Sequence, residues 1–152
     1  MPCQAGLAVL LSAPFLIAAL DPQPLSAVEY TAAGLWLAAL AGELEADRQL
    51  TGFKADPANR GRVCDAGLWR YSRHPNYFFE WIIWVAFSLF AITSPWGAIG
   101  LVSPSLILYF LLRVTGIPAT EAQAVRSKGD ASRHYQETTS AFVPWWPKRD
   151  GR

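Results

Sequence analysis

Residues 67–81 read Gly67-Leu68-Trp69-Arg70-Tyr71-Ser72-Arg73-His74-Pro75-Asn76-Tyr77-Phe78-Phe79-Glu80-Trp81, and they lie where a basic, polar loop meets a long apolar run. Pro75 predicts the first position of a helix, because the N–H that proline lacks is not needed there. The free N–H groups and partial positive charge of such a helix start favour a phosphate-bearing ligand. Asn76 and Glu80 are four residues apart and therefore share one helix face. Glu80 falls inside an apolar segment, where a carboxylate is costly and usually has a function.

The composition is typical of a membrane protein. The chain has 152 residues, which is the length of one domain, and 52% of them are hydrophobic while only 16% are charged. A net charge of +1 favours neither a nucleic-acid partner nor a disordered tail. Cys3 and Cys64 are far apart, and His74 and His134 are isolated, so we expect free thiols and no metal site.

Four apolar segments predict an all-α integral membrane protein with about four transmembrane helices. The spans are expected at about 4–20, 25–44, 75–92 and 96–114, since about 20 helical residues cross a hydrocarbon core of about 30 Å. The first residues lack the positive charge of a signal peptide, so the first apolar segment is interpreted as a membrane helix. A turn at 93–95 ends the third span, and Pro104 is expected to kink the fourth.

The remaining residues form a polar loop over 50–66 and a short helical tail over 115–152, so that residues 1–152 make a single membrane domain. The aromatic cluster Phe142–Pro147 suits a membrane–water interface. Six of the thirteen Lys and Arg residues lie between the second and third spans, and the other seven lie from Arg113 onward. The positive-inside rule therefore predicts that the loop, the tail and both termini are cytoplasmic.

The two basic regions face the same side of the membrane and can converge over the ends of the spans. A group of cations near a helix start suits a phosphorylated, adenine-containing cofactor, and its members are Lys54, Arg62, Arg70, Arg73, His74 and Arg113. Each of these residues alone is also explained by topology and by contact with lipid headgroups. Glu43 and Asp47 share a face, which fits either a solvated helix end or polar groups aimed at a cleft. A Rossmann site is excluded, because no Gly-x-Gly-x-x-Gly follows a strand.

Taken together, these motifs resemble the DUF1295 group of membrane proteins, which is similar to the C-terminal domain of steroid 5-alpha-reductases. The resemblance runs from about Glu43 to Lys148. It rests on Asp47-Arg48-Gln49, Phe53-Lys54, the Arg73–Tyr77 block, Thr115–Pro118 with Glu121, and Tyr135 through Trp145.

The resemblance implies an NADPH-dependent reductase that transfers hydride to the beta carbon of an activated carbon–carbon double bond in a lipid or steroid-like substrate. The implied cofactor-binding residues are Asp47, Lys54, Arg62, Arg70, Arg73, His74, Asn76, Tyr77, Glu80, Arg113, Glu121 and Tyr135. In those reductases the Tyr and Glu that polarise the substrate lie in N-terminal helices that have no counterpart in this sequence. We therefore expect a cofactor-binding half without assigned catalytic residues, whose partners are the lipid bilayer, a hydrophobic substrate and a missing N-terminal half.

Two alternatives stay open. An S-adenosylmethionine-dependent membrane methyltransferase of the isoprenylcysteine or phospholipid type shares Arg-His-Pro, a later Glu and a Tyr-containing tail. Phe79 disfavours it, because Gly is common near that place in the methyltransferases, whereas Asp47-Arg48-Gln49 and Asn76 favour the reductase. The other alternative is a non-catalytic membrane module in which Glu80 is a structural carboxylate.

Overall fold

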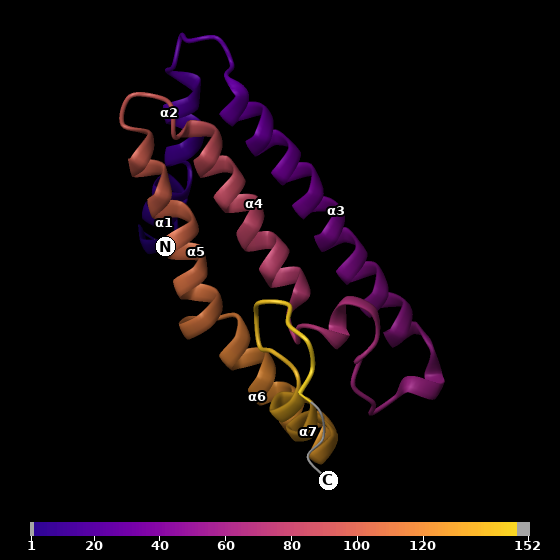
Figure 1. The fold of residues 1–152 in the computed structure, drawn as a ribbon. Coiled ribbons are helices and arrows are strands. Elements are labelled where there is room, and N and C mark those ends of the chain that lie inside the picture. The colour runs from indigo at the N-terminus through magenta and orange to yellow at the C-terminus, as the bar shows by residue number, and fades with distance from the viewer. Residues whose placement is uncertain (1, 149–152) are drawn as a thin grey trace. The chain divides into compact units, whose positions relative to one another are not determined.

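The computed structural model describes residues 2–148, and statements about side chains concern residues 6–148, so Cys3 lies outside them (Figure 1). All regular elements in residues 2–148 are helical, which confirms the all-α class. In chain order they are α1 (Pro2–Leu11), α2 (Ala13–Ala19), α3 (Ala27–Ala55), η1 (Pro57–Asn59), η2 (Gly67–Arg70), α4 (Pro75–Ala91), η3 (Gly97–Leu101), α5 (Val102–Tyr109), η4 (Phe110–Val114), α6 (Ile117–Lys128) and α7 (Asp130–Thr138).

The first apolar segment is divided into α1 and α2, whereas one helix was predicted over 4–20. Pro14 explains the break, because its ring would clash with the carbonyl four residues earlier if α1 continued. The structure places Pro14 in the first turn of α2, where a missing N–H costs nothing. Between the two helices, the Ser12 hydroxyl donates to the Val9 carbonyl at 2.8 Å.

Helix α3 is longer than predicted, since residues 50–55 are helical and not part of the loop. Neither Leu50 nor Thr51 stops the helix, and one glycine at position 52 is tolerated. The stop comes at Asp56, because the residue before Pro57 is excluded from the helical conformation. The Asp56 carboxylate then accepts the Ala58 N–H at 2.9 Å and caps η1.

Helix α4 begins at Pro75 as predicted, and it ends at Ala91, one residue before the predicted end. Pro104 was predicted to kink the fourth span. Pro104 is the third residue of α5, where its missing N–H breaks no intrahelical bond. A π-helical turn, η4, follows α5, and residues 115–116 separate it from α6.

Four membrane spans are not confirmed by the helices of residues 2–148. By length and apolarity, only the continuous helical run Gly97–Lys128 among them could cross a bilayer, with a mean hydropathy of 1.7 in its most apolar part. A buried core helix of a soluble protein can have the same length and composition.

The chain divides into two compact units. The first unit comprises Met1–Leu40 and Glu80–Phe110, and the second comprises Ala41–Phe79 and Leu111–Arg152. In the first unit small side chains such as Ala32, Ala39 and Ala86 are buried and allow close helix packing. Ser88 joins α4 to η3 through its hydroxyl, which donates to the Gly100 carbonyl at 2.8 Å.

Candidate functional site

The loop that precedes α4 is fixed to α3 within the second unit. Gly67 has a φ of +59°, and a Cβ at this position would lie 2.4 Å from Gln49 Oε1. The same Gln49 oxygen accepts the Leu68 N–H at 2.9 Å, and Trp69 Nε1 donates to the Ala46 carbonyl at 2.9 Å. Glycine is therefore required by both the backbone conformation and the close approach of Gln49.

Arg73 ties this loop to α6 and α7. Its Nε and Nη2 lie 2.8 and 2.7 Å from Glu121 Oε1, and its Nη1 donates to the carbonyls of Gln136 and Thr139. Arginine is suited to this role because its planar group presents several donors at once. The carbonyls that it caps lie at the C-terminal end of α7, where positive charge is favourable. These contacts show that Arg73, which was predicted to bind the cofactor, positions the loop.

Tyr135 holds the loop from the other side. Its hydroxyl donates to the carbonyls of Trp69 and Ser72, and burial raises its pKa, so the phenol stays neutral. The C-terminal tail adds two further ties, because Ser72 Oγ donates to the Phe142 carbonyl and the Trp145 N–H donates to the Tyr71 carbonyl, each at 2.8 Å. The second unit therefore holds the Arg-His-Pro loop in one defined conformation.

The side chain of His74 has a buried nitrogen that lacks a hydrogen-bond partner within residues 2–148. The side chain is buried, with 9% of its surface exposed, and its ring stacks on Tyr77 at 5.3 Å between centroids. Its Nε2 lies 3.4 Å from Glu121 Oε1 but makes no hydrogen bond within residues 2–148. Burial lowers the pKa of His74 although Glu121 opposes this effect, which keeps the ring neutral near pH 7. A buried polar atom without a partner costs about 1–3 kcal/mol, so a ligand that supplied one would be favoured.

A cavity of about 330 Å³, here called the central cavity, lies beside His74. Seven residues predicted from the sequence line it: Lys54, Arg73, His74, Asn76, Tyr77, Glu121 and Tyr135. The cavity is also lined by residues that were not predicted from the sequence, among them Cys64, Trp69, Thr120, Lys128 and Ser132. Helical spacing could have indicated Lys128, since it follows Glu121 by seven residues and therefore lies on the same face of α6.

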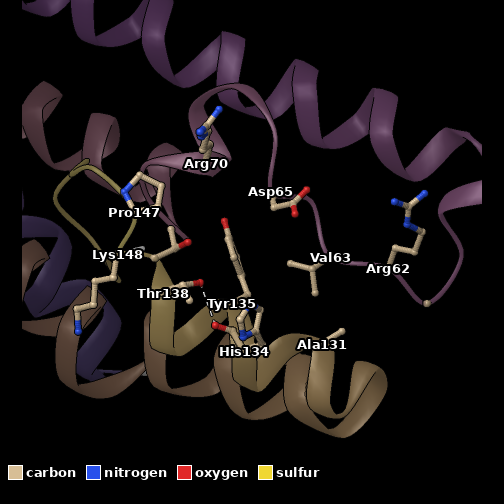
Figure 2. A pocket seen from close by; sticks show the side chains of 12 residues that line it. Arg62, Val63, Asp65, Arg70, Ala131, His134, Tyr135, Thr138, Pro147 and Lys148 are labelled. Atoms are coloured by element: carbon tan, nitrogen blue, oxygen red, sulfur yellow. Dashed lines mark hydrogen bonds between the residues drawn. The ribbon is translucent and has the colours of Figure 1, made fainter. Parts of the chain in front are cut away.

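A larger cavity of about 600 Å³, here called the outer cavity, shares Val63 and Tyr135 with the central cavity. Figure 2 shows Tyr135 rising from α7 toward the loop that carries Asp65 and Arg70, with Arg62 and Lys148 on either side of it. The predicted residues Arg62 and Arg70 line this outer cavity, and neither lines the central one.

The remaining predicted residues lie elsewhere. Asp47 is exposed, and its Oδ1 accepts a hydrogen bond from the Asn76 amide at 3.2 Å, which links α3 to the start of α4. Asp47 lines neither cavity. Arg113 is exposed on η4 and also lines neither cavity. Glu80 is the first residue of α4 that belongs to the first unit.

Comparison with known proteins finds a family and one relative. The profile of a family described as "Protein of unknown function (DUF1295)" matches residues 2–139. An uncharacterised protein of Schizosaccharomyces pombe is 34% identical over 100 residues, which cover 60% of this chain and 27% of the relative. This chain thus spans well under half the length of the relative that it matches. No solved structure matches the chain.

Proposed function

The chain belongs to the DUF1295 family, and on that premise we propose that it is a membrane-embedded NADPH-dependent reductase or the cofactor-binding half of one. The family is related to steroid 5-alpha-reductase-like proteins, in agreement with the resemblance seen in the Arg73–Tyr77 block. The proposed substrate is a lipid or steroid-like molecule with an activated carbon–carbon double bond.

The central cavity is the observation that carries the proposal. The residues that line it include the first turn of α4 and both cationic and neutral hydrogen-bond donors. One of these donors, His74 Nε2, is buried and has no hydrogen-bond partner in residues 2–148. A neutral imidazole can donate to a carboxamide or phosphate oxygen without bringing a charge into the pocket. Lys54 can approach a phosphate as a point charge, and Tyr77 and Trp69 offer aromatic surface to a base or nicotinamide ring.

The size of the site also fits a dinucleotide, if different parts of the ligand occupy the central and the outer cavity. Ligand pockets usually occupy about 300–1,000 Å³, and the central cavity lies at the lower end of this range. The outer cavity shares two lining residues with it and adds Arg62 and Arg70. When bound, NADPH would supply a hydride to the substrate, while the residues of this chain hold and orient it.

The membrane part of the proposal rests on apolar side chains that the first unit leaves exposed. Leu20, Tyr30, Leu37 and Trp96 are between 59% and 82% exposed. Helix α4 has 17 residues, of which Glu80 alone is charged, and its length of about 26 Å approaches the hydrocarbon thickness. Water disfavours such a surface, whereas lipid does not, so we propose four spans with cytoplasmic termini.

Ligand-dependent thermal stability tests the proposed function. The full chain, purified in detergent, should be stabilised by NADPH and not by S-adenosylmethionine, because binding to the native state raises its unfolding temperature. Stabilisation by S-adenosylmethionine alone would favour the methyltransferase, and stabilisation by neither would favour a non-catalytic membrane module.

His74→Phe locates the binding in the central cavity. The phenyl ring keeps the aromatic stacking on Tyr77 and removes the unpartnered Nε2. We expect the variant to fold and to lose most of the temperature shift caused by NADPH. An undiminished shift would separate His74 from the cofactor.

A further inference from the structure

The segment that follows α7 lines a further cavity, here called the tail cavity. Its volume is about 370 Å³, and its lining comes from the Arg-His-Pro loop, from the C-terminal end of α7 and from the segment after it. It shares three lining residues with the outer cavity, Lys148 among them, whereas Trp145 and Trp146 line neither the outer nor the central cavity. All of these residues belong to the second unit.

The two tryptophans of the tail cavity are unusually exposed for side chains of their size. Trp145 is 70% and Trp146 is 73% exposed, and the nearby Val143 is 51% exposed. Neither indole N–H makes a hydrogen bond within residues 6–148, unlike those of Trp69 and Trp81. Large apolar rings with free N–H groups suit surroundings that are apolar and also accept hydrogen bonds, as the headgroup region of a bilayer does.

Both tryptophans are held in place although their segment has no regular secondary structure. The Trp145 N–H donates to the Tyr71 carbonyl at 2.8 Å, and the Lys148 N–H donates to the Thr138 carbonyl at 2.9 Å. The Trp146 ring packs edge-on against Tyr71 at 5.3 Å between centroids. The rings are therefore preorganised, which lowers the entropy cost of binding a ligand to them.

The unpaired charges of the tail cavity are one positive and one negative. Lys148 and Glu137 line it, both are exposed, and within residues 6–148 neither takes part in an ion pair. Arg73 also lines it, but its guanidinium already contacts Glu121 and two carbonyls. A zwitterion complements such a pair, because its anionic group is attracted to the lysine and its cationic group to the carboxylate and to the tryptophan rings.

From this arrangement we infer that the tail cavity binds the headgroup of a zwitterionic phospholipid such as phosphatidylcholine. Lys148 holds the phosphate, and Glu137 and the two tryptophans hold the quaternary ammonium group. The exposed rings and Val143 provide the apolar surface on which the glycerol and the first acyl carbons lie. The inference goes beyond the proposed function, because it needs contact with a bilayer but no binding of NADPH.

Calorimetric titration with dihexanoylphosphatidylcholine, kept below its micelle concentration, tests this site in the full chain in a maltoside detergent. We expect Lys148→Met and Trp145→Leu each to weaken binding by about fivefold or more. Glu137→Gln should weaken the binding of phosphatidylcholine but not that of the anionic short-chain phosphatidylglycerol.

Two matched controls should bind as the wild type does. Arg133→Met removes a positive charge from an exposed position of α7 that does not line the tail cavity. Trp96→Leu removes a ring that is 78% exposed in the first unit. Unfolding midpoints identify folded variants, and if Trp145→Leu does not fold, Lys148→Met at an exposed position decides.

The inference is overturned if the wild type does not bind dihexanoylphosphatidylcholine, or if Lys148→Met binds it as tightly as Arg133→Met does. Tighter binding of the short-chain phosphatidylglycerol would overturn the zwitterion, and binding of free phosphocholine with equal affinity would overturn the lipid. A wild type that binds the short-chain lipid but not NADPH would reject the reductase and leave the headgroup site standing.

Discussion

Replacing Arg73 by methionine should destabilise the second unit more than any loss of a surface charge would. Methionine keeps most of the length of the side chain but removes every guanidinium donor. The change leaves the Glu121 carboxylate and the carbonyls of Gln136 and Thr139 without their partner. The loop, α6 and the end of α7 lose their common contact.

The size of this effect depends on how far the side chains of Arg73 and Glu121 are buried. The side chains of Arg73 and Glu121 are 11% and 22% exposed, so solvent screens their interaction only partly. Removing one partner of a buried ion pair costs about 3–5 kcal/mol, and the lower end applies because Glu121 keeps some contact with water. We therefore expect Arg73→Met to lower the free energy of unfolding by about 3 kcal/mol.

Equilibrium unfolding in detergent measures this effect, and Arg48→Met is the matched control. Arg48 also pairs with a glutamate, Glu45, at 2.7 Å, but the two side chains are 76% and 39% exposed. An exposed pair contributes at most about 1 kcal/mol. Equal losses in Arg73→Met and Arg48→Met would refute the conclusion that Arg73 positions the loop through buried contacts.

Four further predictions follow from the structure and the sequence. The pKa of His74 is lowered in the folded state from 6.5, so its contribution to stability is present above pH 6.5 and lost as the pH falls below it. Between pH 7.5 and 5.5 the free energy of unfolding should therefore fall less in His74→Phe than in the wild type. Gly67→Ala should lower the unfolding free energy by about 1–3 kcal/mol, and an unchanged melting temperature would contradict the required φ and the contact with Gln49. Glu80→Gln should weaken NADPH binding about tenfold, or 1.4 kcal/mol, without affecting expression. A lower melting temperature without ligand, together with an undiminished increase on adding NADPH, would instead indicate that Glu80 has a structural role. A cysteine at position 23 should react with a non-permeant reagent in intact cells, and labelling only after lysis would reject the four-span topology.

The sequence predicted helix positions best where one residue type leaves a single physical choice. Pro75 fixes the start of α4, because it suits the first helical position and excludes the residue before it from the helix. The same rule applied to Pro14 would have divided the first apolar segment, and applied to Pro57 it would have extended α3 to Ala55. Apolar composition alone indicated that these segments are helical but not where the helices break or end.

The sequence motifs indicated several residues that lie together around the central cavity, but not the contacts that they make. Motif residues such as His74 and Tyr77 line the central cavity, but Arg73 and Tyr135 are engaged with main-chain carbonyls. Such contacts join residues more than 60 positions apart, so no local pattern reveals them. Lys128, which also lines the central cavity, was not predicted, although it lies seven residues after Glu121 on the same face of α6.

Calorimetric titration of the wild-type chain with NADPH and with NADH tests the central claim most directly. The cations Lys54, Arg60, Arg62 and Lys128 give a 2′-phosphate several partners, so we expect NADPH to bind more tightly than NADH by at least tenfold. The advantage should decrease as salt concentration rises, since part of it is electrostatic. Equal affinity for the two dinucleotides, or no heat of binding with either, would contradict the assignment of this site to NADPH.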